Sequence, residues 1–216
     1  MQIVIFFCRK MMNSLLTRLA HRLLEVPMIF ELQESLCNDY GSIRKEFSEY
    51  LSKDGLKILD IGCGTGVSAS VIVDMEHQSY TGIELMSGYA AIAAKRNPKG
   101  KVLAMDATKM DFPSHSFDLA FFSGVWHHMD DKTVRRVLVE TKRVLKTKGV
   151  LLVAEPLFTP GRWYSNMLLK RDRGRHIRTR DGYLALVKDW YTERERTFNF
   201  SLHRSLSLVL RPKAPR

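Results

Sequence analysis

The stretch "ILDIGCGTGVSA", residues 58–69, decides the fold, because an apolar run that ends near an aspartate leads directly into three glycines within five positions. At a bend from a strand into a helix, glycine permits a positive φ and lets a ligand approach bare backbone. A helix that starts near Thr65 would direct free N–H groups and the positive end of its dipole at an anionic group. We therefore expect this bend to hold a ligand with a negative group.

The spacing of the glycines separates two classes of ligand. Dinucleotide sites use G-x-G-x-x-G, whose third glycine allows close packing of the helix. Here the run Gly62-Cys63-Gly64-Thr65-Gly66 is one residue too short. A nicotinamide oxidoreductase or other nucleotide binder is therefore a poor match, and a plain tight turn remains the structural alternative.

Short apolar runs alternate with helix-length segments through the middle of the chain. Strands are predicted at 57–61, 80–85, 101–104, 117–123 and 149–156, and helices near 66–75, 87–97 and 131–146. This alternation indicates βαβ units, a largely parallel sheet and right-handed crossovers. After Pro156 the pattern becomes loop and helix, and 195–203 and 205–212 then read as two closing strands of an antiparallel hairpin.

A single domain is expected, because 216 residues with 45% hydrophobic content can build one substantial core. We divide the domain 1–216 into a helical cap at 12–52, a core at 55–156, and substrate-side helices with a closing hairpin at 157–216. Within the cap, 12–25 is amphipathic, for which core packing is the simpler explanation and a membrane-surface contact the alternative.

The charge and the cysteines limit the partners and the compartment. The chain has 34 Lys and Arg against 23 Asp and Glu, a formal charge of +11. Such a charge attracts phosphates, anionic lipids or acidic substrates, although a solvated positive face explains it equally simply. Cys8, Cys37 and Cys63 form no C-x-x-C pair, so we expect no metal site and a reducing compartment. The apolar opening "MQIVIFFC" is too short to cross a bilayer, so we expect a cytoplasmic location without a transmembrane segment.

With Asp60 ahead of it, the bend resembles the D-x-G-x-G-x-G signature of class I S-adenosylmethionine-dependent methyltransferases. Three later segments, "YTGIEL", "LAMDATKMDFPSHSFDLAFFSGVWHHM" and "VLKTKGVLLVAEP", are similar to successive sections of the same family, in order and spacing. The resemblance covers about residues 50–156 and is greatest to the type 11, UbiE-like group of small-molecule methyltransferases.

This resemblance implies an α/β Rossmann-like fold, with a seven-stranded, mostly parallel sheet whose last strand is antiparallel. Helices would cover both faces, and the extra N-terminal helices would precede the first strand. S-adenosylmethionine would be the cofactor, with Glu84 on the ribose hydroxyls and Asp106 on the adenine amino group. The cofactor-binding residues that it implies are Asp60, Gly62, Cys63, Gly64, Gly66, Glu84, Leu85, Asp106, Ala107, Ser123 and Gly124.

The segment "SGVWHHMDD", residues 123–131, follows the fourth predicted strand into the same crevice. His127 is the candidate general base, because a neutral imidazole accepts a proton near physiological pH. The alternative is that the aromatic and histidine pair only closes the end of the strand. Asp130 and Asp131 read as N-cap residues of the following helix.

The run from Lys170 to Arg180 is strongly basic and lies between the fifth and sixth predicted strands. In this family the region often covers the substrate, so an acidic acceptor would account for it. A solvated basic face is the alternative. The candidate substrate contacts are Trp126, Arg171, Arg173 and Arg175.

Two functions compete on this evidence. The first is methyl transfer to a small molecule, acidic or lipid-linked. The second is methylation of RNA or protein through the basic 170–180 segment. Against the second, "SGVW" lacks the D/N-P-P-Y/F stretch used on exocyclic amino groups, and no nucleic-acid module is appended. Nucleic acid is therefore a possible partner that the sequence does not favour, and the oligomeric state is left open.

Overall fold

The structure is a computed structural model that describes residues 39–170, 174–200 and 203–213. The elements along the chain are α4 (Tyr40–Glu46), α5 (Ser48–Leu51), β1 (Lys57–Ile61), α6 (Val67–Ile72), β2 (Ser79–Glu84), α7 (Ser87–Arg96), β3 (Lys101–Ala104), β4 (Phe117–Ser123), the 3₁₀ turn η1 (Trp126–His128), α8 (Asp131–Val144), β5 (Leu145–Pro156), α9 (Trp163–Leu169), α10 (Arg180–Leu186), β6 (Trp190–Phe200) and β7 (His203–Pro212).

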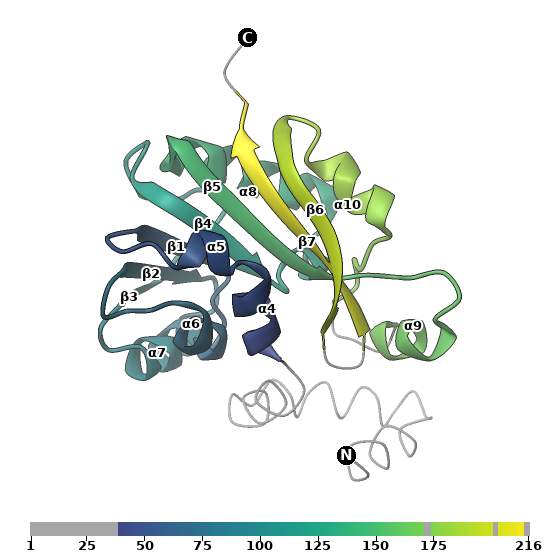
Figure 1. Cartoon of the computed structure of the whole chain (residues 1–216). Helices are drawn as coiled ribbons and strands as arrows, with labels where there is room; N and C mark the ends of the chain where they lie inside the picture. The colour runs from purple at the N-terminus through teal and green to yellow at the C-terminus, as the bar shows by residue number, and fades with distance from the viewer. Residues whose placement is uncertain (1–38, 171–173, 201–202, 214–216) are drawn as a thin grey trace.

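The strands form one seven-stranded sheet in the order β3-β2-β1-β4-β5-β7-β6 (Figure 1). Pairing is parallel from β3 to β5, whereas β7 runs antiparallel to β5 on one side and to β6 on the other. The order reverses between β1 and β4, and open α/β sheets bind their ligands in a crevice outside the carboxyl ends of the strands at such a point. The mostly parallel sheet with an antiparallel last strand confirms the sequence prediction.

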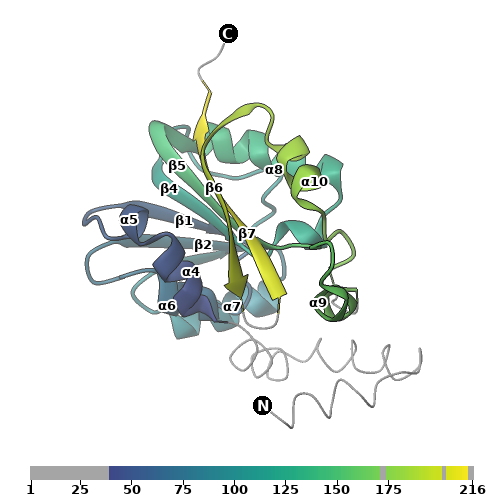
Figure 2. The same ribbon diagram turned by 45° about the vertical axis from the view of Figure 1, so that its right-hand side comes forward.

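Helices lie on both faces of the sheet, as expected. Figures 1 and 2 show α4 and α5 on one face and α8 and α10 on the other. Because successive side chains of a strand point to opposite faces, neighbours in β1 enter different cores. Ile58 packs with the cluster under α4 and α6, and Leu59 with the cluster under α8 and α10.

Helix α8 is anchored by a side-chain cap at its start. The Asp130 carboxylate accepts a hydrogen bond from the Thr133 backbone N–H at 2.7 Å, which confirms Asp130 as the N-cap. The helix ends at Val144, because Leu145 is extended and pairs with Phe117 of β4. The boundary predicted from sequence, a helix to 146 and a strand from 149, was wrong by a few residues because this pairing is tertiary.

The two strands of the hairpin also begin and end differently from the prediction. β6 starts at Trp190, five residues before the predicted 195, so the hairpin is longer on its first strand. Of the predicted cap at 12–52, residues 12–38 lie outside the described residues, and the remainder holds α4 and α5.

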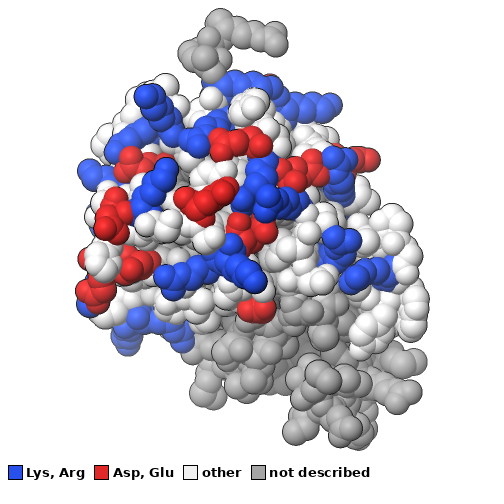
Figure 3. Space-filling model, viewed as in Figure 1, with Lys and Arg blue, Asp and Glu red and all other residues white. Residues whose placement is uncertain are grey.

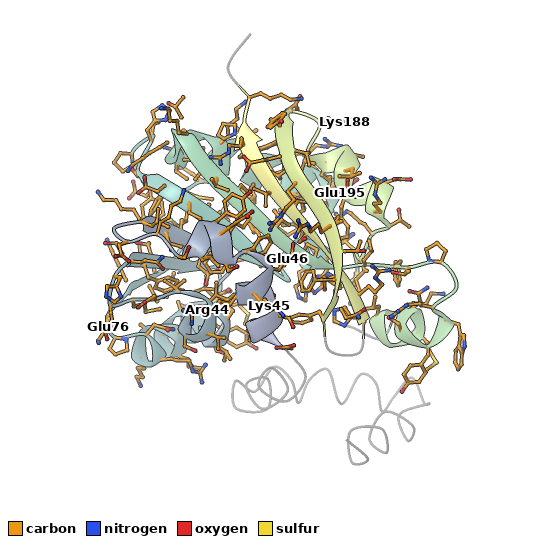
Figure 4. All side chains as sticks on the ribbon, viewed as in Figure 1. Arg44, Lys45, Glu46, Glu76, Lys188 and Glu195 are labelled. Carbon is orange, nitrogen blue, oxygen red and sulfur yellow. The ribbon has the colours of Figure 1, made fainter. Side chains whose placement is uncertain are left out.

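Helix α4 packs between α6 and the hairpin. The Arg44 guanidinium on one side donates to the Val71 carbonyl of α6 at 3.2 Å. On the other side, Glu46 lies next to β6 and accepts from the Ser207 hydroxyl of β7 at 2.9 Å (Figure 4). Basic and acidic side chains alternate over this face of the molecule (Figure 3).

Candidate active site

The glycine bend connects β1 to α6 and is tied to the end of the neighbouring strand. Gly62, Gly64 and Gly66 all have positive φ, at 78°, 56° and 79°. The Gly62 and Cys63 backbone N–H groups donate to the Ile83 carbonyl at 2.8 and 3.0 Å. The Gly64 N–H donates to Glu84 Oε2 at 3.1 Å. The bend and the Glu84 carboxylate are therefore one hydrogen-bonded unit.

Two of these glycines are explained by packing inside the protein. A Cβ on Gly62 would lie 2.8 Å from Cγ1 of Val125, and one on Gly66 would lie 2.3 Å from the Asn97 side chain. Both distances are shorter than real contacts. From the sequence alone we expected a ligand to approach these positions. The residues that pack against them, Val125 and Asn97, lie much later in the chain, so this packing is not visible in the sequence.

Asp60 and Cys63 lie beneath the bend and are buried. The Tyr80 hydroxyl donates to Asp60 Oδ2 at 3.0 Å. Burial, reinforced by the nearby Asp60 and Glu84 charges, raises the pKa of the Cys63 thiol. The thiol is therefore held in its neutral form, which fits a packing role for this side chain.

Glu84 ends β2 at the rim of the crevice. Its Oε1 accepts from the Met86 N–H at 2.9 Å, so each carboxylate oxygen already holds one backbone group. A carboxylate accepts about four hydrogen bonds. Capacity for two hydroxyl donors therefore remains at this strand end.

An exposed apolar surface follows Glu84 directly. Leu85 and Met86 are 71% and 54% exposed, and they are adjacent in the chain. The adjacent strand β3 pairs Ala104 with Glu84, and Asp106 and Ala107 follow it. Hydrogen bonds from Thr108 hold the pKa of the exposed Asp106 below its usual range. Two carboxylates, Glu84 and Asp106, therefore lie at or just after the paired ends of β2 and β3.

The turn after β4 is built around a buried carboxylate that the sequence analysis missed. Ser123 ends β4, and Gly124 has φ of 68° and donates its N–H to the Ala154 carbonyl at 2.8 Å. Glu155 of β5, only 1% exposed, then receives the backbone N–H groups of the next three residues. Its Oε1 accepts from Val125 and Trp126 at 2.7 Å each, and its Oε2 from His127 at 3.2 Å.

The His127 ring is held by the same carboxylate. Its Nδ1 lies 2.9 Å from Glu155 Oε2, and the residue is 7% exposed. Two glycines lie close to carbon atoms of the ring. A Cβ on Gly124 would lie 3.5 Å from Cε1, and one on Gly174 would lie 2.0 Å from Cδ2. These carbons are the two neighbours of Nε2, so that nitrogen lies at the junction of the β4 turn and the segment that contains Gly174.

Trp126 does not face the crevice. It is 0% exposed and packs in the core against Phe122 and Tyr183, with ring centroids 5.4 and 6.4 Å away. A direct contact with substrate, expected from its place in "SGVWHH", does not fit this burial. The 3₁₀ turn η1 rotates the indole into the sheet-helix interface, which the linear sequence does not reveal.

The basic segment divides into structural and exposed members. Arg171 and Arg173 lie outside the described residues, and Arg175 is exposed. Arg178, in contrast, donates to the Trp126 and Met129 carbonyls at 3.0 and 2.8 Å and pairs with Asp131 at 2.7 Å. Arg178 therefore stabilises the turn after β4. From the sequence alone, Arg178 could not be told apart from the other arginines of the basic run.

Across residues 39–170, 174–200 and 203–213, three or more His, Cys, Asp or Glu side chains never gather as a metal site requires. None of the helices in this part of the chain has the length and apolar composition needed to cross a bilayer.

The residues at the rim fit the parts of an adenosine. A flat, apolar ring matches the exposed surface of Leu85 and Met86, hydroxyl donors match Glu84, and an amino donor matches Asp106. Gly64 and Gly124, both with positive φ, follow the ends of β1 and β4, which are neighbouring strands.

Comparisons with known proteins point to a methyltransferase domain. Residues 59–153 match the family model described as a methyltransferase domain. The chain is 35% identical over 143 residues to a sterol 24-C-methyltransferase of Gibberella zeae, covering 63% of this chain and 37% of that protein. It is 36% identical over 102 residues to a demethylmenaquinone methyltransferase of Thermotoga maritima, covering 47% and 44%.

A third relative is an O-methyltransferase of Aspergillus nomiae, 35% identical, with 55% of each chain covered. The chain thus spans about half or less of the length of these curated relatives. Among solved structures, the Pyrococcus horikoshii protein PH0226 has a TM-score of 0.66 at 20% identity, covering 81% of this chain and 91% of that one. Mitomycin 7-O-methyltransferase gives 0.67 at 20% identity, covering 81% and 53%. These two structures share the fold.

Proposed function

We propose that this chain, whose residues 59–153 match a methyltransferase domain, is a class I S-adenosylmethionine-dependent methyltransferase and that it methylates a small-molecule acceptor. The observation that carries the proposal is the Glu84 carboxylate at the end of β2, which is hydrogen-bonded to the glycine bend at Gly64, is followed by the exposed Leu85, and pairs with the end of β3, two residues before Asp106.

We assign the cofactor contacts as follows. Glu84 accepts from the ribose hydroxyls, Leu85 and Ala107 pack against the adenine, and Asp106 accepts from its amino group. Gly64, Ser123 and Gly124 line the methionine side, while Asp60, Gly62, Cys63 and Gly66 shape the bend from within the protein. When bound, S-adenosylmethionine supplies an electrophilic methyl group on a sulfonium.

The protein's own contribution to the reaction is alignment and, for an acceptor that carries a proton, a base. His127 is the base that we propose, since its ring lies at the junction of the β4 turn and the Gly174 segment. Arg175, with the neighbouring Arg171 and Arg173, would favour an acidic acceptor through charge-assisted hydrogen bonds.

Small-molecule acceptors are favoured by the names of the relatives, which act on sterols and quinones or are O-methyltransferases. Lipid-linked acceptors belong to this class, so we keep acidic and lipid-linked compounds as the first to screen. Methylation of RNA or protein is not favoured by any of these relatives. The cytoplasmic location remains a prediction.

Calorimetric titration with S-adenosylmethionine, with its demethylated product and with NAD tests the proposal. We expect binding of both sulfur ligands and none of NAD. Glu84→Ala should weaken binding by about 10- to 100-fold, because a hydrogen bond to a charged group contributes about 1.5–3 kcal/mol.

Glu76→Ala is the matched control, because this exposed carboxylate precedes β2 and pairs with Lys99 on the surface. It should bind the cofactor like the parent protein. If a folded protein takes up neither sulfur ligand, the proposed function is wrong. If Glu84→Ala binds as tightly as the parent, the cofactor does not use this rim.

A further inference from the structure

We propose that helix α9 docks on the surface of an anionic lipid bilayer, with the rings of Trp163 and Tyr164 inserted among the lipid headgroups. The helix follows β5 at the carboxyl end of the parallel strands, the same end at which the glycine bend leaves β1. The inference rests on the proposed function only for its consequence, that a lipid-linked acceptor is taken directly from the bilayer.

Trp163 and Tyr164 are exposed side by side at the start of α9. Tryptophan is highly buried on average, and the other two tryptophans of the chain, Trp126 and Trp190, are only 0% and 4% exposed. Trp163 is 74% exposed and Tyr164 is 40% exposed. Their ring centroids lie 5.7 Å apart and their ring planes meet at 84°. The two rings, which we call the aromatic pair, therefore form one continuous exposed surface.

The opposite face of α9 is attached to the rest of the fold. Ser165 and Leu169, which lie one helical turn apart, are each 5% exposed, and the helix packs against β7. The Asn166 side chain accepts from the Thr159 N–H at 3.0 Å and donates to the Thr159 carbonyl at 2.8 Å, so it fixes the preceding loop on the helix. The aromatic pair therefore faces away from the protein, and Figures 1 and 2 show α9 at the edge of the molecule.

Exposed cations stand at both ends of the helix. Arg162 directly precedes α9 and Lys170 directly follows it, and both are exposed. In the sequence, Asp172 is the only acidic residue between Glu155 and Asp181. At the place of α9, Figure 3 shows an uncharged surface with basic side chains beside it. Basic residues around an exposed aromatic face are attracted to anionic lipid headgroups, so the charge favours an anionic bilayer.

The small size of the aromatic pair favours a bilayer over a second protein. A fully buried aromatic side chain removes about 150–250 Å² from water, whereas a stable protein interface needs roughly 800 Å² on each partner. Two rings fall well short of that area. Shallow insertion into a bilayer needs only a few side chains, and tryptophan and tyrosine are enriched where the lipid meets water, because each combines an apolar ring with a polar N–H or O–H.

Tryptophan fluorescence of the full chain tests the docking without cofactor or acceptor. Vesicles of equal parts phosphatidylcholine and phosphatidylglycerol should shift the emission to shorter wavelength, and brominated acyl chains should quench it, because Trp163 is the exposed tryptophan. Trp163→Tyr should remove both effects while an interfacial ring keeps the protein on the vesicles. If the folded parent shows no shift, or co-sediments with vesicles whose brominated lipids do not quench it, α9 does not dock and the proposal is wrong.

Co-sedimentation with the same vesicles measures what the aromatic pair contributes. The double variant Trp163→Ser with Tyr164→Ser should bind at least about 10-fold more weakly, the loss expected for withdrawing one aromatic ring from an apolar environment. Tyr191→Ser is the matched control, because Tyr191 is 58% exposed but pairs with Arg211 at the far end of β7. It should bind like the parent. Equal binding of the double variant and the parent would overturn the proposal.

Arg162→Gln and Lys170→Gln test the charge. Each should weaken binding about 5-fold, the effect of one basic residue near an anionic membrane surface. Binding of the parent should fall as salt is raised, and vesicles of phosphatidylcholine alone should bind much more weakly. Binding that is equal on the two kinds of vesicle would contradict the proposed lipid.

Two further measurements separate a bilayer from other occupants. Glycerol phosphate, the soluble headgroup fragment, should leave the fluorescence unchanged, and a shift with this compound alone would assign the site to a free phosphate. A shift that grows with protein concentration in the absence of vesicles would assign it to a second copy of the chain. Either result would overturn the proposal. S-Adenosylmethionine binding is titrated separately, so its absence in a protein that still docks would refute the proposed function alone.

Discussion

At the scale of single residues, the glycine bend needs glycine for two separate reasons, a positive φ and close packing against neighbouring side chains, which the sequence alone does not separate. Gly62 has φ of 78° and faces Val125, whereas Gly88 of α7 faces open space. Gly62→Ala should therefore destabilise the fold by about 2–5 kcal/mol, from strain at positive φ and from overpacking against Val125. Thermal unfolding should show a Tm lower by roughly 5–15 °C.

Gly88→Ala is the control for this prediction, because it adds the same methyl group to a helix at no steric cost. It should leave the Tm unchanged or raise it slightly, since alanine is favoured over glycine inside helices by about 0.5–1 kcal/mol. Equal Tm values for the two variants would contradict the packing account of Gly62. Adding Val125→Ala to Gly62→Ala should recover part of the loss.

At the scale of elements, the Asp130 cap makes the stability of α8 depend on pH. Hydrogen bonds from Thr133 hold the pKa of Asp130 below its usual range. A lowered folded pKa means that the cap stabilises the fold above the unfolded pKa, near 3.9. This stabilisation is lost as pH falls through the folded value. The Tm advantage of the parent over Asp130→Ala should therefore be present at about pH 6 and shrink below about pH 4.

Asp130→Asn separates the charge from the cap, because asparagine also caps helices but does not titrate. Its Tm should stay above that of Asp130→Ala at both ends of this range. A parent advantage that is constant down to about pH 3 would show that the carboxylate charge contributes nothing to the cap.

At the scale of the whole molecule, one arginine connects the first described helices to the hairpin. Arg194 of β6, with its side chain 15% exposed, donates to the Glu46 carbonyl and to Glu49 Oε1 at 2.6 Å each. Its guanidinium also lies 5.9 and 5.3 Å from the ring centroids of Phe47 and Tyr50. Arg194→Met should therefore loosen α4 and α5 and leave β1–β5 as they are.

Hydrogen exchange followed by mass spectrometry measures this. Amides of 40–51 should exchange about 10-fold faster or more in Arg194→Met, which corresponds to about 1.4 kcal/mol of local stability. Arg196→Met, an exposed position on the same strand, is the control. Faster exchange spread evenly over the sheet, or no change in 40–51, would show that Arg194 does not anchor these helices.

Local patterns were enough to predict the sheet, because alternating apolar runs and the glycine bend are short-range signals. Such patterns do not carry contacts made across the fold. In the sequence, Glu155 resembles any acidic residue at the end of a strand. Its role becomes visible only in the structure, where β5 lies beside β4 and Glu155 accepts the backbone N–H groups of the turn. Arg178 reads as one member of a basic run, and only the structure shows that it contacts the turn after β4. Trp126, adjacent to His127 in sequence, is turned into the core by η1. The roles of the site residues as ligands remain predictions.

The position of β7 between β5 and β6 has a consequence for how the protein is made. During synthesis, β1 to β5 leave the ribosome while the strand that must pair with the outer side of β5 is still inside it. Until residues 203–212 emerge, the apolar run Leu151–Ala154 has an open edge that any extended peptide can join. A nascent chain released after β5 has emerged but before residues 203–212 have emerged is therefore prone to aggregate. We expect chaperones to bind the chain mainly at this stage of synthesis.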